Sequence, residues 1–261
     1  MTEPVVLVER HGDALAIVTL NRPDRRNALS IELLDSLRQA FETLAAEPGR
    51  RAVILRGAGP VFCAGLDLVE AADVSVTEQS AGLIAALLTT IMSSPLATVA
   101  AVQGGAYAGG GGLMAACDFA LLADDAKVGF PEVRRGLTPA LISVVLEGRL
   151  RNGDLRELFL LAEPVDARRA LEIGLVNRVV PRDRLGEEAR SLAETVMLGA
   201  PDAVRRTKQL LRSSRESDVA RRMAEALAAH EAVRTSDEAF EGLAAFRERR
   251  HPAWQSTPPD G

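Results

Sequence analysis

Residues 103–113 read QGGAYAGGGGL, and this glycine-rich stretch follows the apolar, strand-like run 97–102. A second loop, at residues 61–68, reads VFCAGLDL and follows the strand-like run 52–55 in the same way. Small residues in both loops allow another group to approach the main chain closely. Two such loops at neighbouring strand ends can direct two backbone N–H groups at one oxygen, which is the geometry of an oxyanion hole.

The glycine run at residues 109–112 has two physical interpretations. Close packing of a helix on a strand needs small residues, but each glycine in a helix interior costs roughly 1 kcal/mol against alanine. A function that uses bare main chain accounts better for that cost, because the first N–H groups of a helix are free and attract an anion. Neither G-x-G-x-x-G nor G-x-x-x-x-G-K-[ST] occurs, so an NAD-dependent dehydrogenase is a poor candidate.

The composition is that of an ordinary globular protein. The 261 residues are 47% hydrophobic and 26% charged, with a formal net charge of −5. This balance provides no basic surface for nucleic acid, and no run reaches the ~18 apolar residues of a membrane span. The N-terminus lacks the pattern of a signal peptide, and two cysteines make no disulfide framework. We therefore expect a cytoplasmic protein that binds neither nucleic acid nor membrane.

Apolar periodicity predicts an α/β region followed by a helical region. We expect strands at 5–9, 15–20, 53–55, 98–102 and 119–123, and helices at 31–46, 78–93 and 109–116. Strands that alternate with helices indicate a largely parallel sheet. After Pro139 the pattern favours helices at 155–161, 167–173, 184–198, 203–212, 218–234 and 237–249, with one strand at 176–180. We divide the chain into a core at 1–195 and a C-terminal helical region at 196–261.

Four further segments, together with the two loops, carry a resemblance to a known family. They are LNRPDRRNALS at 20–30, FPEVRRGLTP at 130–139, ALEIGLVNRVV at 170–180 and EGLAAFRERR at 241–250. With these six segments in the expected order, the chain resembles the crotonase superfamily, also called the enoyl-CoA hydratase/isomerase family. The resemblance implies an α/β spiral of repeated ββα turns, with C-terminal helices that mediate trimerisation. It also implies a homotrimer or a hexamer made of two trimers.

The resemblance implies chemistry at the carbonyl of an acyl-CoA thioester. The oxyanion donors would be the backbone N–H groups of Leu66 and Gly109, and the general acid/base would be Glu132. Family hydratases usually carry a second glutamate three residues beyond the oxyanion glycine, where this chain has Gly112. Hydration of a 2-enoyl-CoA and a double-bond shift therefore both stay open. Either reaction belongs to fatty-acid or acyl-CoA metabolism and implies no metal and no cofactor, since CoA arrives with the substrate.

The resemblance also implies which residues bind the CoA part of the substrate. The residues assigned to this role are Arg25, Arg26, Ala28, Ala64, Asp67 and Gly110. Arginine can bind phosphate through two parallel N–H groups, and main-chain groups can recognise the adenine. The alternative is that the two arginines are an exposed pair in a turn. Asp67 could mainly organise its own loop.

The role of Glu132 has its own alternatives. Partial burial would raise the pKa of Glu132 toward the working pH, as a general base requires. It could instead be a surface glutamate paired with Arg134 or Arg135. Loss of the other glutamate also allows a protein of a different class, one that binds acyl-CoA with weak or lost catalysis.

Two further points concern the surroundings of the site. Glu70 or Asp67 could hold a water in place of the missing glutamate, although the sequence does not place either side chain. Residues 140–146 replace a glycine-rich stretch that many hydratases carry, and they should make the wall of the acyl pocket bulkier. The three isolated histidines are expected at the surface.

Overall fold

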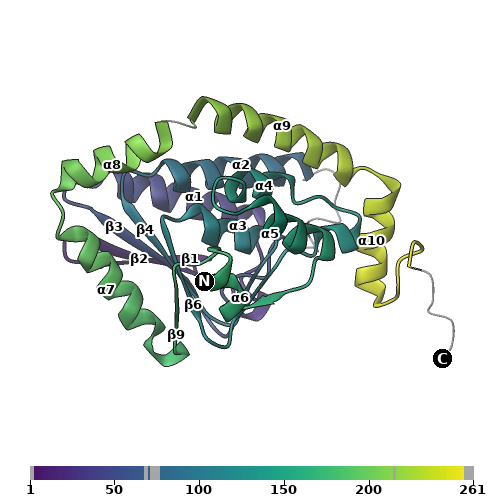
Figure 1. Cartoon of the computed structure of the whole chain (residues 1–261), viewed down its shortest axis with the longest axis horizontal. Coiled ribbons are helices and arrows are strands. Elements are labelled where there is room, and N and C mark those ends of the chain that lie inside the picture. Colours follow the sequence, from purple (N-terminus) through teal and green to yellow (C-terminus); the bar gives the residue numbers. More distant parts are fainter. Residues whose placement is uncertain (1–2, 68–69, 71–76, 214–215, 256–261) are drawn as a thin grey trace.

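A six-stranded sheet of mostly parallel strands is the centre of the fold (Figure 1). The computed structural model describes residues 3–67, 70, 77–213 and 216–255, so the last position of the 61–68 loop lies outside it. In sheet order the strands are β1 (Val6–His11), β2 (Leu15–Leu20), β3 (Ala52–Gly57), β4 (Ala97–Val102), β6 (Phe119–Ala123) and β9 (Arg178–Val180). β1 pairs antiparallel with β2, and the later pairings in this sheet are parallel.

A smaller second sheet turns the chain into a spiral. It contains β5 (Gly105–Tyr107), β7 (Lys127–Gly129) and β8 (Val165–Asp166). Single bridges extend it, because Cys63 pairs with Ala106 and Leu66 pairs with Leu29. One turn of the spiral is β4, β5 and then helix α3 (Gly109–Ala116). The predicted α/β spiral of ββα turns is confirmed.

Helices cover both faces of the large sheet (Figure 1). α1 (Ile31–Ala46) begins after Ser30, whose hydroxyl accepts a hydrogen bond from the Leu33 N–H at 3.2 Å, as the predicted start of this helix requires. Leu33, Leu37 and Phe41 are buried on its apolar face, and α1 packs against α2 (Thr77–Ser93). α7 (Leu185–Met197) packs on β3, β4 and β6.

The C-terminal helices return over the region that follows β7. They are α8 (Pro201–Ser213), α9 (Glu216–Arg234) and α10 (Asp237–Glu248). α9 crosses α2 and α4 (Ala140–Leu146), and α10 packs on the helical turn η4 (Glu132–Arg135). A Cβ atom on Gly242 of α10 would lie 2.3 Å from the Arg135 backbone, so the two segments are in close contact. Among the described helices, none has the length and apolar character needed to cross a membrane.

The predicted elements differ from the structure where segments are short. Strands β5, β7 and β8 and helix α4 are missing from the prediction, because two or three residues show no strand alternation and seven residues make only about two helical turns. The helix expected at 155–161 is a helical turn α5 (Asn152–Arg156) that continues as a π-helical turn η5 (Glu157–Leu161). The strand expected at 176–180 begins at Arg178, after α6 (Ala167–Glu172).

Candidate active site

The two glycine-containing loops lie side by side, although 40 residues separate them in sequence. The Tyr107 N–H donates to the Cys63 carbonyl at 3.0 Å, and the Cys63 N–H donates to the Gly105 carbonyl at 3.3 Å. Gly65 permits the close approach, because a Cβ atom there would lie 2.8 Å from the Tyr107 oxygen and 2.9 Å from the Ala108 Cβ. The contact joins the end of the first loop to the start of α3.

Both expected oxyanion donors follow a residue with positive φ. Gly65, with φ of +89°, precedes Leu66, and Ala108, with φ of +49°, precedes Gly109. Positive φ is unusual for alanine and is often found where a functional site requires a particular backbone orientation. Within the described part of the chain, neither the Leu66 N–H nor the Gly109 N–H donates to a protein acceptor. Both groups can therefore donate to a bound oxygen.

Two glycines of the run serve packing. A Cβ atom on Gly110 would lie 2.6 Å from the Cys63 oxygen, and one on Gly111 would lie 2.6 Å from the Phe130 ring. Gly110 is thus buried against the first loop, and the CoA contact expected for it stays a prediction. The packing interpretation thus holds for Gly110 and Gly111, and the main-chain role of Gly109 stays a prediction.

Gly112 occupies the position of the missing glutamate, and neighbouring side chains fill the space in front of it. A Cβ atom there would lie 3.3 Å from Ile142 Cγ1 and 3.6 Å from Leu88 Cδ2. Ile142 belongs to α4, within the segment 140–146 that was expected to make the pocket wall bulkier. The loss of the carboxylate is therefore accompanied by an apolar wall at the same place.

Glu132 is buried at the start of η4, with 8% of its surface exposed. Burial raises the pKa of the Glu132 carboxyl to about 7, and the nearby Arg135 offsets a small part of that rise. Its Oε2 atom is buried and has no hydrogen-bond partner among the described residues. The alternative of a surface glutamate paired with Arg134 is wrong, since Arg134 pairs with Glu163 at 3.3 Å. Arg135 does not form an ion pair with Glu132 either, but it adds a favourable charge.

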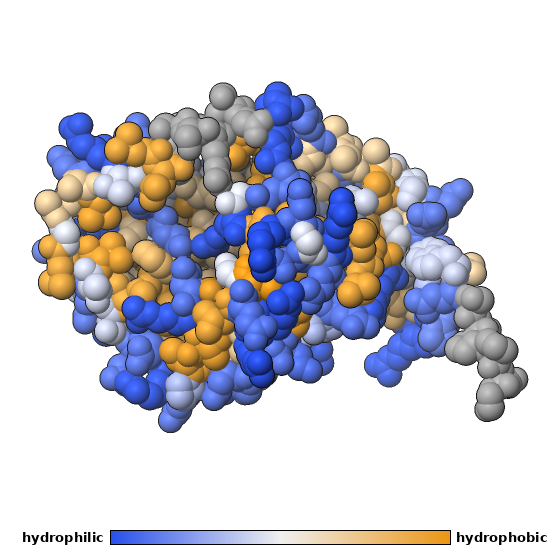
Figure 2. Space-filling model, in the orientation of Figure 1, coloured by the Kyte–Doolittle hydropathy of each residue, from blue (hydrophilic) through white to orange (hydrophobic). Residues whose placement is uncertain are grey.

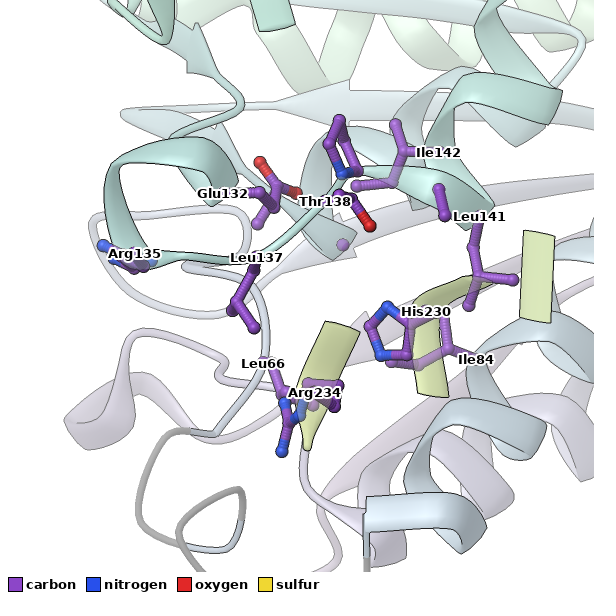
Figure 3. Close-up of a pocket in the computed structure, with 14 residues that line it drawn as sticks. Leu66, Ile84, Glu132, Arg135, Leu137, Thr138, Leu141, Ile142, His230 and Arg234 are labelled. Atoms are coloured by element: carbon purple, nitrogen blue, oxygen red, sulfur yellow. The ribbon is translucent and has the colours of Figure 1, made fainter. Parts of the chain in front are cut away.

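A single cavity brings the predicted catalytic groups together (Figure 3). Leu66, Gly109 and Glu132 all line it. Its volume is about 60 Å³. Since one water needs roughly 10–15 Å³ of such space, the cavity accommodates only a small group without rearrangement. Its apolar walls include Ile84, Leu137, Leu141 and Ile142.

Helix α9 contributes polar side chains to the same cavity. His230 and Arg234 line it together with Glu132, as Figure 3 shows. The expectation that His230 is a surface residue is wrong, because the last turns of α9 cover the cavity. Burial lowers the pKa of the His230 imidazole to about 4, and the positive charge of Arg234 adds to this effect. His230 lies 98 residues after Glu132 in the chain, so the sequence around it gives no local signal of this placement.

The two expected CoA-binding segments are in contact. The Ala64 N–H donates to the Arg26 carbonyl at 3.0 Å, and the Leu29 N–H donates to the Gly65 carbonyl at 2.8 Å. Arg25 and Arg26 are exposed at the end of the turn η1 (Pro23–Arg25). Ala28 and Ala64 are half-buried beside them. Two exposed cations thus lie next to the loop that leads to Leu66.

Asn27 holds this turn in place and was not singled out from the sequence. It is fully buried, and its Nδ2 donates to the carbonyls of Ala58, Val61 and Phe62 at 2.9, 2.9 and 3.1 Å. Its Oδ1 accepts from the Arg22 N–H at 2.9 Å. Asparagine tolerates its observed φ of +54° better than most residues. The signal available in the sequence was an Asn within the turn segment 20–30, since this residue type favours turns.

The two candidates for water positioning are engaged elsewhere. Asp67 pairs with Arg22 at 2.9 Å, in agreement with a role in organising its loop. Glu70 accepts from the Ile31 N–H at 2.9 Å, at the start of α1. Neither residue belongs to the described cavity lining. Glu132 is the carboxylate found there.

We expect Asn27→Asp to destabilise the fold by about 3 kcal/mol, because the new carboxylate cannot donate to three carbonyls and is buried. Urea unfolding would measure the change. Asn177→Asp is the matched control, since its Oδ1 acts as an acceptor for the Ala120 N–H at 2.8 Å and aspartate keeps that role. Equal losses in both variants would show that the Asn27 donors do not stabilise the turn.

Comparison with known proteins agrees with the fold and the site. A family model described as enoyl-CoA hydratase/isomerase matches residues 10–257. A protein of Thermus thermophilus named putative enoyl-CoA hydratase is 40% identical over 253 residues, which cover 94% of this chain and 99% of that protein. A crystal structure of an enoyl-CoA hydratase from Mycobacterium avium has a TM-score of 0.88 at 33% identity, covering 97% of this chain and 100% of that chain.

A second solved structure is described as both a hydratase and an isomerase. The enoyl-CoA hydratase/isomerase of Xanthobacter autotrophicus Py2 matches with a TM-score of 0.84 at 33% identity and covers 95% of this chain and 94% of that chain. The fold and these matches define an enzyme of the crotonase type. The chain belongs to the enoyl-CoA hydratase/isomerase family.

Proposed function

We propose that this enzyme shifts the carbon–carbon double bond of an enoyl-CoA thioester through an enolate, with Glu132 as the single acid/base. The observation that carries this proposal is one buried carboxylate with a raised pKa, in a described cavity lining that holds no second one. A proton shift needs one group that takes and returns a proton. The usual hydration scheme shares a water between two carboxylates.

The steps follow from general chemistry. Glu132 removes a proton from C2 of a 3-enoyl-CoA, and the electron pair moves onto the thioester oxygen. The Leu66 and Gly109 N–H groups donate to that oxygen, and losing one such donor typically costs about 3–4 kcal/mol of transition-state stabilisation. Glu132 then returns the proton at C4, and the double bond re-forms between C2 and C3. The product is an isomer of the substrate, so no water, metal or redox cofactor is consumed.

CoA binding is assigned to the surface beside the first loop. Support comes from the exposed Arg25 and Arg26 and from the hydrogen bond between Arg26 and Ala64. The guanidinium groups would pair with CoA phosphates, and main-chain groups near Ala28 and Ala64 would contact the adenine. Asp67 would act indirectly, through its ion pair with Arg22.

Hydration of a 2-enoyl-CoA is the second candidate, because relatives such as the Thermus thermophilus protein carry hydratase names. It would require a water held by Glu132 and by a group other than a second carboxylate. An acyl-CoA-binding protein without turnover is the alternative from another class. The family membership supports an enzyme over a pure binder.

The test compares two substrates by the absorbance of the conjugated thioester. We expect absorbance to increase with 3-hexenoyl-CoA as it becomes the 2-enoyl ester, and to decrease little with crotonyl-CoA. A rapid decrease in absorbance with crotonyl-CoA, and no increase with 3-hexenoyl-CoA, would favour hydration instead. No change with either ester, together with measurable binding of both, would favour the binding protein.

The rate should depend on pH through Glu132. The base must be ionised, and the pKa of this carboxyl is raised to about 7 by burial. We therefore expect kcat/KM to rise about tenfold per pH unit below pH 7 and to level off above it. A profile measured from pH 5 to 9 on the 3-enoyl ester tests this. A plateau that extends down to pH 5 would exclude Glu132 as the titrating group.

Restoring the missing glutamate alone should not create a hydratase. In Gly112→Glu the new side chain would meet Ile142 and Leu88, so we expect a loss of about 1–3 kcal/mol in stability and no gain in crotonyl-CoA hydration. Gly112→Ala adds only the Cβ atom and serves as the control. The double variant Gly112→Glu/Ile142→Ala should recover stability. A stable, hydrating single variant would contradict the crowding argument.

We also propose a cytoplasmic homotrimer or a hexamer of two trimers, formed through the C-terminal helices. Support comes from large apolar side chains at the surface there, and Figure 2 shows apolar side chains gathered over α8. Leu198, Leu210 and Leu211 are 86%, 71% and 74% exposed. Such patches on an isolated chain mark interaction surfaces. Light scattering after gel filtration would give three or six chain masses if the proposal holds.

A further inference from the structure

The cavity contains polar groups that the proposed proton transfer does not use. Thr138 lies between η4 and α4, and His230 comes from α9. Figure 3 shows the Thr138 hydroxyl and the His230 ring facing the same space as Glu132. The rest of that lining is apolar, with Leu137, Leu141 and Ile142 among others, except for the guanidinium groups of Arg135 and Arg234. An unsubstituted alkyl chain in the cavity could not form hydrogen bonds with the Thr138 hydroxyl or the His230 ring.

The Thr138 hydroxyl is buried and has no hydrogen-bond partner among the described residues. A buried hydroxyl without a partner is uncommon in folded proteins, because its desolvation is not compensated. A hydroxyl can donate one hydrogen bond and accept two. A ligand oxygen in the cavity would satisfy it.

His230 is an uncharged hydrogen-bonding group near neutral pH. Burial, and to a lesser degree the charge of Arg234, lowers the pKa of the imidazole to about 4. A neutral imidazole has one N–H donor and one ring nitrogen that accepts. Together with Thr138 it therefore suits an oxygen that carries no charge. A ligand carboxylate would be costlier to desolvate among Leu137, Leu141 and Ile142 than a hydroxyl or a carbonyl, and ionised Glu132 would repel it. The positive charges of Arg135 and Arg234 in the same lining offset part of that cost, so a carboxylated ester is included in the test below.

We propose that the acyl group of the natural substrate is short and carries a hydroxyl or carbonyl oxygen away from the thioester, bound by Thr138 and His230. This inference rests on the proposed acyl-CoA function and specifies its substrate class. The small cavity volume of about 60 Å³ favours a short acyl group. The apolar walls hold its carbon chain.

Calorimetry with unreactive, saturated CoA esters tests the inference without requiring turnover. The probes are four- and six-carbon acyl-CoA esters, each unsubstituted, with a hydroxyl or oxo group on the last or next-to-last carbon, or with a terminal carboxylate. We expect at least one hydroxy or oxo ester to bind about tenfold more tightly than its unsubstituted parent, as one or two neutral hydrogen bonds provide. His230→Phe and Thr138→Val should reduce that ratio to about one.

Two control variants separate recognition from general disturbance. Thr138→Ser keeps the hydroxyl and should keep the preference, and His251→Phe changes an exposed histidine outside the cavity lining. If the unsubstituted esters bind as tightly as every hydroxy or oxo ester, the inference is overturned, while the proposed function stays intact. Tightest binding of a carboxylated ester would also overturn it. Failure of every ester to bind would overturn the proposed function as well.

Discussion

Glu132→Gln is expected to lower turnover of a 3-enoyl-CoA by roughly 10²–10⁴-fold, the usual range for removing a general acid/base. Glutamine has nearly the same shape as glutamate, but it cannot accept and return a proton. Glu132 lies in the cavity with the Leu66 and Gly109 N–H groups, and no other carboxylate is in the described lining. Steady-state kinetics would show the loss in kcat, and calorimetry should show that CoA esters still bind.

Glu163→Gln is the matched control for this variant. Glu163 is exposed and pairs with Arg134 outside the cavity lining, so the same chemical change there should leave turnover within about twofold. If Glu132→Gln keeps more than a tenth of the wild-type rate, Glu132 is not the acid/base. If the wild-type protein has no turnover but binds the esters, the binding alternative is favoured.

The Glu132→Gln variant should also gain stability relative to the wild-type protein as pH rises. Burial raises the pKa of Glu132 from 4.5 to about 7 in the folded protein, so the folded state holds a proton that the unfolded state releases. The contribution of this group to the free energy of unfolding is highest below pH 4.5. It decreases by on the order of 3 kcal/mol as pH rises to about 7. Glutamine removes this dependence. Urea unfolding at pH 4.5 and 8 should therefore show the variant gaining relative to wild type, and parallel curves would contradict the raised pKa.

Gly65→Ala is expected to lower kcat by roughly 10²–10³-fold, the range found when one oxyanion donor is lost. The added Cβ atom would lie 2.8 Å from the Tyr107 oxygen and 2.9 Å from the Ala108 Cβ, so the backbone must shift. That contact joins the peptide before Leu66 to the peptide before Gly109. A displacement there disturbs both donors at once. The φ of +89° adds a backbone strain of about 1 kcal/mol or more.

Gly174→Ala separates the clash from the backbone strain. Gly174 has a similar φ of +78°, but no atom lies within 4 Å of an added Cβ. We expect this control to lose stability and to keep its kcat. The two variants can be compared by kcat after thermal unfolding has shown that both are folded. Equal kcat values would mean that the approach of the two loops does not position the donors.

The sequence predicts the larger elements well because their signals are local. Ser30 caps α1 as expected, and the apolar run at 119–123 is β6 with the same bounds. The short strands of the second sheet give no such signal, although they bring Cys63 beside Ala106 and thereby align the loops. The boundary at residue 195, the roles of the site residues and the trimer stay predictions.

The sequence by itself determined the family and the replacement of one family glutamate by Gly112, because motifs reside in neighbouring residues. The α/β spiral is predicted from the resemblance to that family, and periodicity predicts the larger helices and strands. Only the tertiary structure decided that Glu132 is buried with a raised pKa and that Ile142 and Leu88 fill the space before Gly112. It also placed His230 in the cavity. Burial, desolvation and contact depend on groups that lie far apart in the chain and meet only after folding.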